Sequence, residues 1–263
     1  MEKELNRLLN ELKGYAGKIS PNLLPLINKF IESCKGGKGL RGKLVVLGYE
    51  IGKQSSAISY QSSDKDILKI AAAYEIMHSA ILAHDDIIDQ SPTRRGQPSL
   101  YKSVGIEQAI TLADLGFFLA IKIISESNFP EKEKNNALKL FSQTMVETAI
   151  GQMLDIQKGD SATVMELKTA KYTVAGPLQL GAVLGGAKRN LLDQLDKFGE
   201  NLGVAFQIRD DMLDGEVRSL DQSRVEMLKY AGLAKKIITK ITNDPKMIKL
   251  LEELVDYMVE RKK

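Results

Sequence analysis

The chain has 263 residues, of which 43% are hydrophobic and 27% are charged. This is an ordinary globular composition, and it excludes collagen-like, disordered and disulfide-scaffold proteins. Lysine and arginine (37) exceed aspartate and glutamate (34) by only 3, so nucleic acid is not expected as the main partner.

Three further features favour a cytoplasmic protein without a transmembrane segment. The single cysteine, Cys34, has no partner for an internal disulfide, which suits a reducing compartment. No run reaches the roughly 18 apolar residues of a membrane span. The charged first segment, MEKELNRLLNELK, does not resemble a signal peptide.

Helical periodicity dominates the chain in order. We expect a first helix around residues 5–12, a break at Pro21 and Pro25, and a helix over 26–34. A Gly-rich loop at 36–43, a short helix to 52 and a polar loop at 53–65 follow. A long helix over 66–89 precedes a loop at 91–99. The remaining helices are expected over 106–125, 131–158, 164–187, 191–214, 222–241 and 245–262.

No strand pattern and no hairpin signal is evident, and no shift in composition marks a border. The sequence therefore predicts an all-α protein with a single domain over residues 1–263.

Two aspartate clusters, HDDIIDQ and RDDMLDG, each end an apolar helix. The residues are Asp85, Asp86, Asp89, Asp210, Asp211 and Asp214. Residues i and i+4 share one helix face, so Asp85 and Asp89 point together, as do Asp210 and Asp214. Carboxylates this close repel unless a cation intervenes, and oxygen ligands alone favour Mg²⁺. A solvated helix end is the alternative for one cluster, but it fits two poorly.

Basic and polar side chains accompany the clusters. Arg94 and Arg95 follow the first cluster, and Lys38 and Arg41 lie in the Gly-rich loop. Arginine suits bidentate binding of phosphate. Each pair alone also fits a solvated surface.

Other polar residues lie on the helices that carry the clusters or on apolar helices nearby. His78 lies two turns before Asp85 on the same face, either as a ligand or as a satisfied core residue. Gln207 lies on the second acidic helix among apolar neighbours and needs a partner if buried. Lys168 and Thr169 interrupt an apolar helix and equally fit an exposed face.

These stretches together resemble the trans-isoprenyl diphosphate synthase (polyprenyl synthetase) family. The matching segments run in the family's order from 36 to 214, about two thirds of the chain: GGKGLRGK, EIMHSAILAHDDIIDQSPTRRGQPS, GQMLD, KTAKYTVAGPLQLGAVLGG and FGENLGVAFQIRDDMLD. Two aspartate-rich motifs with RRG after the first form a specific combination.

The resemblance implies an isoprenoid synthase-type helical bundle around a deep apolar cavity. It implies an allylic diphosphate held by three Mg²⁺ between the clusters, with isopentenyl diphosphate beside it. By position, Lys38, Arg41, His78 and Arg95 resemble contacts to isopentenyl diphosphate. Arg94, Lys168 and Gln207 resemble contacts to the allylic diphosphate, with Thr169 beside the developing cation. Ionisation, condensation and proton loss would follow.

The chain departs from the family pattern at several positions. Gly39 and Gly42 stand where the family commonly has a basic residue and a proline, and Ala113 replaces a glycine. The lysine-bearing GK…GKD loop is replaced by GEVRSLDQSRVEM, in which Arg218 or Arg224 are candidate phosphate contacts.

The resemblance also implies a homodimer, and the apolar stretch with Leu115, Phe117, Phe118 and Leu119 supplies either an interface or core. A class I terpene cyclase is one alternative, although its second metal motif is usually an Asn/Ser/Glu pattern. A weakly active partner subunit is another, although such subunits tend to lose aspartates.

Product length depends on the stripe before Asp85. In members that make short products, a bulky aromatic often stands four or five residues before the first aspartate, where this chain has Ile81 and Ala80. Met77 and Tyr74 come next, and Tyr74 lies roughly 16 Å along the helix from Asp85. We expect a product from C20 to about C30, unless these residues only pack the core.

Overall fold

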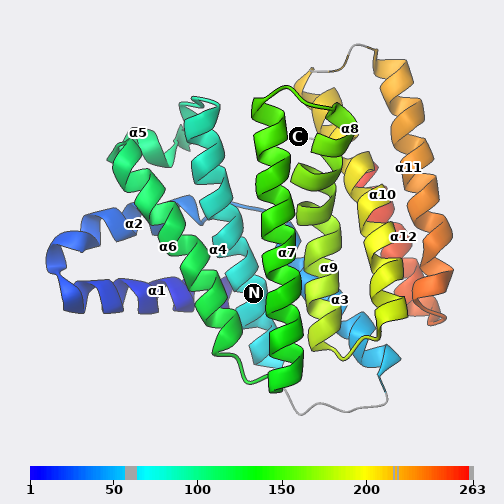
Figure 1. Cartoon of the computed structure of the whole chain (residues 1–263), viewed down its shortest axis with the longest axis horizontal. Coiled ribbons are helices and arrows are strands. Elements are labelled where there is room, and N and C mark those ends of the chain that lie inside the picture. Colours follow the sequence, from blue (N-terminus) through cyan, green and yellow to red (C-terminus); the bar gives the residue numbers. More distant parts are fainter. Residues whose placement is uncertain (57–63, 216, 218, 261–263) are drawn as a thin grey trace. The chain divides into compact units, whose positions relative to one another are not determined.

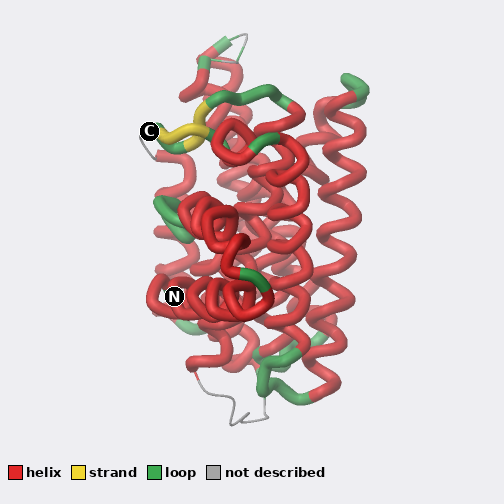
Figure 2. The backbone as a smooth tube through the Cα atoms, turned by 90° about the vertical axis from the view of Figure 1, so that its left-hand side faces the viewer, coloured by secondary structure: helices red, strands yellow, loops and turns green. Residues whose placement is uncertain are grey.

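The structure is a computed structural model that describes residues 1–56, 64–215, 217 and 219–260. Helices make up nearly all of the described chain (Figures 1 and 2). The chain forms two compact units, one of residues Met1–Lys43 and Ser62–Phe129 and the other of residues Leu44–Gln61 and Pro130–Lys263. The all-α prediction is confirmed, whereas the prediction of one domain stays a prediction.

The first unit begins with α1 (Glu2–Ile19), the short 3₁₀ helix η1 (Pro21–Leu23) and α2 (Leu24–Ser33). The first residues of α3 (Leu40–Ser55) and the long α4 (Asp64–Ile88) follow. Strands β1 (Thr93–Arg94) and β2 (Gln97–Pro98), α5 (Leu100–Val104) and α6 (Ile106–Ser125) complete the unit.

Helix α4 is the core of this unit, and every residue from 70 to 80 is buried. It lies along α6, where small residues allow close approach (Figure 1). A Cβ added at Gly116 of α6 would come within 2.9 Å of the Ala80 side chain and 2.8 Å of Phe30. The interface therefore requires glycine at 116 and holds α4 in a fixed position.

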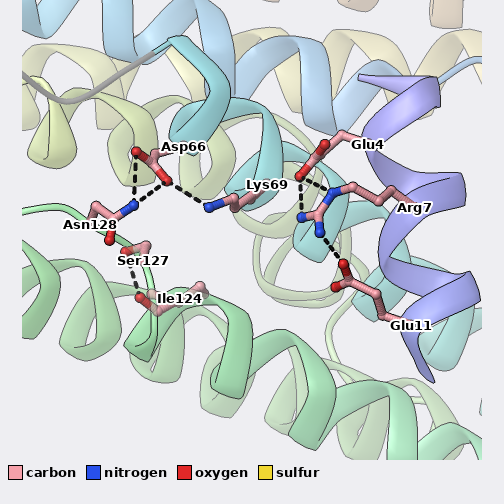
Figure 3. A network of polar contacts seen from close by, with 8 residues as sticks. All are labelled: Glu4, Arg7, Glu11, Asp66, Lys69, Ile124, Ser127 and Asn128. Atoms are coloured by element: carbon pink, nitrogen blue, oxygen red, sulfur yellow. Dashed lines mark hydrogen bonds and ion pairs between the residues drawn. The ribbon is translucent and has the colours of Figure 1, made fainter. Parts of the chain in front are cut away.

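A buried polar network holds the start of α4 (Figure 3). Asp66 is only 3% exposed and accepts hydrogen bonds from Lys69 Nζ (2.9 Å) and from Asn128 Nδ2 (3.2 Å). On α1, Glu4 accepts a bond from Arg7 Nε at 3.0 Å, and this bond lowers the pKa of Glu4. The bond from Asn128 ties Asp66, and with it the end of α4 far from the aspartate cluster, to the segment that follows α6.

The second unit contains the rest of α3, α7 (Glu131–Ile156), α8 (Ser161–Val164) and a π-helix, η2 (Met165–Ala175). It continues with α9 (Gly176–Leu184), α10 (Arg189–Asp214), α11 (Leu220–Ile241) and α12 (Pro245–Glu260). Its helices pack through glycines. A Cβ at Gly203 of α10 would meet the Ala170 carbonyl oxygen of η2 at 2.9 Å.

The predicted helices are largely confirmed, with three differences among the helices and a fourth in the loop at 91–99. Helix α3 begins at Leu40, so Arg41 is helical and not in the Gly-rich loop. The helix α5 follows the loop at 91–99 and was not predicted. The segment expected as one helix over 164–187 is divided among the end of α8, η2 and α9. Most of the polar loop at 53–65 lies outside the described residues.

The fourth difference is a hairpin where none was predicted, coloured yellow in Figure 2. Thr93 pairs with Pro98 and Arg94 with Gln97. The two-residue turn between the strands is Arg95–Gly96, and both residues have positive φ, +53° and +73°. Type I′ turns need this geometry. The paired residues are polar or proline, which is why the sequence pattern did not indicate a hairpin.

Candidate active site

The first aspartate cluster lies at the C-terminal end of α4. Asp85 is half-buried, and Asp89 is exposed just beyond the last helical residue. Asp86 differs, because it is 2% exposed and its Oδ1 accepts bonds from Arg94 Nε (2.9 Å) and Nη2. The hairpin thus places Arg94 on Asp86, on a different helix face from Asp85 and Asp89.

A second group of cations surrounds His78 in the same unit. Arg41 Nη1 lies 3.1 Å from His78 Nε2. Burial lowers the pKa of His78 well below its usual value, and the charges of Arg41, Arg95 and Arg94 lower it further. The structure therefore brings together four of the five predicted phosphate-binding residues of this unit. Lys38, the fifth, is exposed in the loop that precedes α3.

Two backbone contacts position these cations. Glu75, which is 7% exposed, accepts a bond from the backbone N–H of Gly42 at 2.7 Å and so caps the first turn of α3, where Arg41 lies. Arg95 Nη1 donates to the Lys35 carbonyl at 2.7 Å. Sequence reasoning missed Glu75, although a carboxylate on the buried stripe of α4 signals a need for a partner.

The second cluster lies at the C-terminal end of α10, in the other unit. Asp210 and Asp211 are half-buried, and Asp214 is exposed. Gln207 Nε2 donates to Asp211 Oδ1 at 2.6 Å, so Gln207 has the partner that its apolar neighbours required. Burial raises the pKa of Asp211, and the charge of Asp214 raises it further, whereas the bond from Gln207 lowers it. A cation at this position would relieve both unfavourable effects.

The π-helix η2 carries Lys168 and Thr169, both half-buried. Lys168 Nζ forms an ion pair with Asp155 Oδ2 of α7 at 2.6 Å. π-Helical turns frequently mark functional sites. Asp155 was not singled out, although it ends the GQMLD segment, and no local sequence signal indicated the π-helix.

The same unit has a polar cavity of about 1090 Å³ lined by α7, η2, α9 and α10. In it, Lys171 Nζ lies 3.5 Å from Glu147 and 3.7 Å from Glu200. Burial lowers the pKa of Lys171, but the surrounding carboxylates outweigh it and the pKa is raised. Burial also raises the pKa of Asp196. Sequence reasoning did not anticipate this network.

The predicted chain-length residues lie on α4. Tyr74, Met77 and Ala80 are fully buried, and Ile81 is half-buried. Ala80 contacts α6 at Gly116, so it belongs to the helix interface. Within the described residues, none of the four lines this polar cavity or the smaller cavity beside the hairpin. The deep apolar cavity and the role of these residues stay predictions.

Two helices expose apolar stripes. On α6, Phe118 is 70% exposed, and Ile110 and Ile121 lie on the same side. Leu115, Phe117 and Leu119 are half-buried, and Phe117 meets His84 edge-on at 5.5 Å. Among the described helices, α6 alone has the length and composition of a membrane span, properties that also fit a core helix. On α7, a stripe of four exposed residues comprises Val146, Ile150, Met153 and Ile156.

The acidic helix ends suit the predicted metal in part. Within the described residues, no group of three or more His, Cys, Asp or Glu side chains is arranged to hold a metal ion. The ends of α4 and α10 nevertheless fit Mg²⁺, which needs only one or two carboxylates beside phosphate oxygens and water. Arg218, the predicted phosphate contact, lies outside the described residues, and Arg224 is exposed on α11.

Comparison with known proteins gives a consistent result. A family profile described as Polyprenyl synthetase matches residues 24–223. A geranylgeranyl diphosphate synthase of Methanosarcina mazei is 30% identical over 201 residues, which are 71% of this chain and 60% of that protein. A short chain isoprenyl diphosphate synthase of Methanocaldococcus jannaschii is 30% identical over 80% of this chain and 62% of its own length.

A solved structure shares the fold. It is the geranylgeranyl pyrophosphate synthase from Corynebacterium glutamicum, complexed with isoprenyl diphosphate and magnesium. Its TM-score is 0.89 at 20% identity, with 99% of this chain and 97% of that chain covered. The sequence match spans 60% and 62% of the length of the two curated relatives.

Proposed function

This chain belongs to the polyprenyl synthetase family, and we propose that it condenses isopentenyl diphosphate with an allylic diphosphate. The product is a trans-polyprenyl diphosphate of C20 to about C30. The observation that carries the proposal is a pair of acidic helix ends, on α4 and α10, each accompanied by cations or an amide within its own unit. The named relatives are diphosphate synthases, which does not favour a terpene cyclase.

The aspartates would hold Mg²⁺, which we propose as three ions per active site. Asp85 and Asp89 would supply ligands from α4, and Asp210, Asp211 and Asp214 from α10. Asp86 is the sixth predicted metal ligand, and in this structure its carboxylate accepts a bond from Arg94. When bound, Mg²⁺ supplies neutralisation of the departing diphosphate. The raised pKa of Asp211 supports this assignment, because burial disfavours its unpaired negative charge.

The cations of the first unit would bind isopentenyl diphosphate. Arg41, Arg95 and Lys38 supply positive charge, and His78 lies against Arg41 with a lowered pKa. A neutral imidazole contributes hydrogen bonding without adding repulsion to the arginines. The buried Glu75 holds the start of α3 and thereby the base of Arg41.

The allylic diphosphate would contact Arg94, Lys168 and Gln207, with Thr169 beside the carbocation. Lys168 is held by Asp155, and Gln207 by Asp211. Preorganised groups of this kind stabilise developing charge without reorganising during the reaction. Apolar surroundings would exclude water from the carbocation before the proton is lost.

We further propose a cytoplasmic homodimer. The exposed stripes on α6 and α7 support it, because Phe118 and Met153 are 70% and 60% exposed. Exposed apolar patches on soluble proteins mark interaction surfaces. Light scattering should therefore give about twice the 29.1 kDa of the chain, and Phe118→Glu should shift it towards the monomer.

The test of the reaction uses purified protein with Mg²⁺, labelled isopentenyl diphosphate and each allylic starter, followed by chromatography of the products. Asp85→Ala and Asp210→Ala should each lower turnover about a hundredfold or more, or on the order of 3 kcal/mol of barrier. Asp193→Ala, which removes an exposed carboxylate on α10, is the matched control. Near wild-type turnover in either cluster variant would refute the mechanism.

A further inference from the structure

One lysine of the second unit, Lys171, connects the π-helix η2 to the two long helices on either side of it. Its Nζ lies 3.5 Å from Glu147 of α7, 3.7 Å from Glu200 of α10 and 4.0 Å from Glu166 of η2. The charge of Asp196 of α10 also acts on it. The proposed reaction assigns no role to any of these five residues.

The π-helix depends on its neighbours for its shape, because π-helical hydrogen bonding is rare and occurs mostly as single turns. Glycines of both neighbouring helices lie against its backbone. A Cβ added at Gly151 of α7 would come within 2.6 Å of the Lys168 backbone nitrogen, and one at Gly203 of α10 within 2.4 Å of Ala170 Cα. Because η2 is packed this closely, a displacement of α7 or α10 would move its backbone.

Two lysines of η2 join it to α7 at separate points. Lys168 pairs with Asp155 at 2.6 Å, and Lys171 approaches Glu147. Positions 147 and 155 are eight residues apart, or about 12 Å along α7. Lys171 also reaches α10 through Glu200. Two points on α7 and one on α10 together determine the orientation of η2, and hence the direction in which the Lys168 side chain projects.

The charges around Lys171 are predominantly negative. Four carboxylates act on its ammonium, from α7, η2 and α10: Glu147, Glu166, Asp196 and Glu200. Helix α9, GPLQLGAVL, has no ionisable side chain. Burial raises the pKa of Asp196 and of Glu200, and the charge of Lys171 opposes both rises, whereas Asp193 adds to the rise at Asp196. Without Lys171, these carboxylates would repel one another across the interfaces of η2.

We propose that Lys171 is a positioning residue of the reaction, which fixes η2 between α7 and α10 and so holds Lys168 and Thr169 towards the allylic diphosphate. Lys171 itself would not contact the substrate. The assignment rests on the proposed function, because that function places Lys168 and Thr169 at the allylic substrate. It adds a chain-specific requirement, namely a cation among the carboxylates behind the π-helix.

Steady-state kinetics with both substrates test the role. Lys171→Met keeps the length of the side chain and removes its charge, and it should lower kcat/KM for the allylic diphosphate by about tenfold or more. The KM for isopentenyl diphosphate should not change, because its predicted contacts lie in the first unit. Lys171→Arg should restore the allylic kcat/KM, since a guanidinium can serve several carboxylates. The matched control Lys235→Met breaks the ion pair of Lys235 with Asp256, between α11 and α12, and should change neither parameter.

The pH dependence separates positioning by charge from a loss of packing. In Lys171→Met the pKa values of Asp196 and Glu200 should rise further, because the attraction that opposes their rise is gone. Lowering the pH from about 8 to about 6 should then protonate part of them and relieve the repulsion. The ratio of variant to wild-type allylic kcat/KM should therefore increase as the pH falls. A ratio that is equal at both pH values, an equal rise in both KM values, or a Lys171→Arg variant as defective as Lys171→Met would overturn the proposal.

Two further measurements keep the proposal testable. If Lys171→Met does not fold, as judged by circular dichroism, Lys171→Gln gives the same comparison with an amide that can hydrogen-bond to the carboxylates. Absence of wild-type turnover would refute the proposed function and not the coupling of the helices. Amide hydrogen exchange of residues 165–175, measured on the free protein by mass spectrometry, tests that coupling directly. Exchange should be faster in Lys171→Met than in Lys235→Met, and equal exchange would show that Lys171 does not fix η2.

Discussion

The pairing of Asp86 with Arg94 separates one aspartate of the first cluster from the other two. Its carboxylate is 3% exposed and accepts two bonds on the same oxygen, one at 2.9 Å from Arg94 Nε. A hydrogen bond to a charged group contributes about 1.5–3 kcal/mol. Arg94 is 40% exposed, so solvent screens part of this attraction. We expect Arg94→Ala to lower the free energy of unfolding by about 2 kcal/mol.

A double-mutant cycle isolates this interaction. Asp86→Asn should cost about 1–2 kcal/mol, and the double variant little more than the larger single change, which gives a coupling energy of about 1.5 kcal/mol. Urea denaturation followed by circular dichroism in EDTA removes any contribution of metal. Asp85→Asn should be neutral or stabilising by about 0.3–1 kcal/mol, because it removes a negative charge from a helix C-terminus.

The controls make the result decisive. Arg189→Ala removes an arginine that is 89% exposed and pairs with Asp193, so it should cost less than about 0.5 kcal/mol. Effects of Asp86→Asn and Arg94→Ala that simply add would refute a direct pair. If Asp86→Asn leaves the free energy of unfolding unchanged but raises the Mg²⁺ concentration needed for turnover, Asp86 is a metal ligand instead.

Three other changes give further tests. Gly203→Ala should cost about 1–3 kcal/mol in urea denaturation because its Cβ would meet the η2 backbone, whereas Gly14→Ala on α1, with nothing within 4 Å, should not destabilise. The pKa of His78 is lowered, so the unfolded chain binds a proton that the folded chain excludes, and stability should fall as the pH drops below about 6.5. His78→Gln should remove this fall in the urea midpoint, and persistence of the full fall in this variant would contradict the assignment. Tyr74→Ala should lengthen the chromatographed product, and an unchanged product distribution would refute a chain-length role.

The long periodic helices could be predicted from the sequence because their apolar stripes repeat over several turns. Helix α6 is confirmed at Ile106–Ser125 as expected, and α10 ends at Asp214 as expected. The i, i+4 rule also identified the acidic helix ends from residue spacing alone. Short and irregular elements were not predicted from the sequence, because tertiary contacts determine them. The bond from Gly42 to Glu75 holds the start of α3, and no local pattern signals it.

The sequence predicted the individual residues of the candidate site, but it did not predict which of their side chains contact one another. The sequence grouped Asp86 with Asp85 because both lie in one motif, whereas the two side chains lie about 100° apart on the helix. The pairing with Arg94 depends on a turn that reverses the chain within two residues. Likewise, Lys168 meets Asp155 across 13 residues, through packing of α7 and η2. Sequence spacing carries no information about contacts of this kind.

At Arg95, in the turn of the hairpin, the backbone conformation and the side chain favour different residues. Arg95 holds a φ of +53°, a conformation that suits asparagine or glycine better than arginine. Asparagine followed by Gly96 would relax the backbone, but it would remove the guanidinium. Arg95→Asn would therefore exchange the relaxed backbone for the loss of the bond to the Lys35 carbonyl and of the phosphate contact proposed for Arg95.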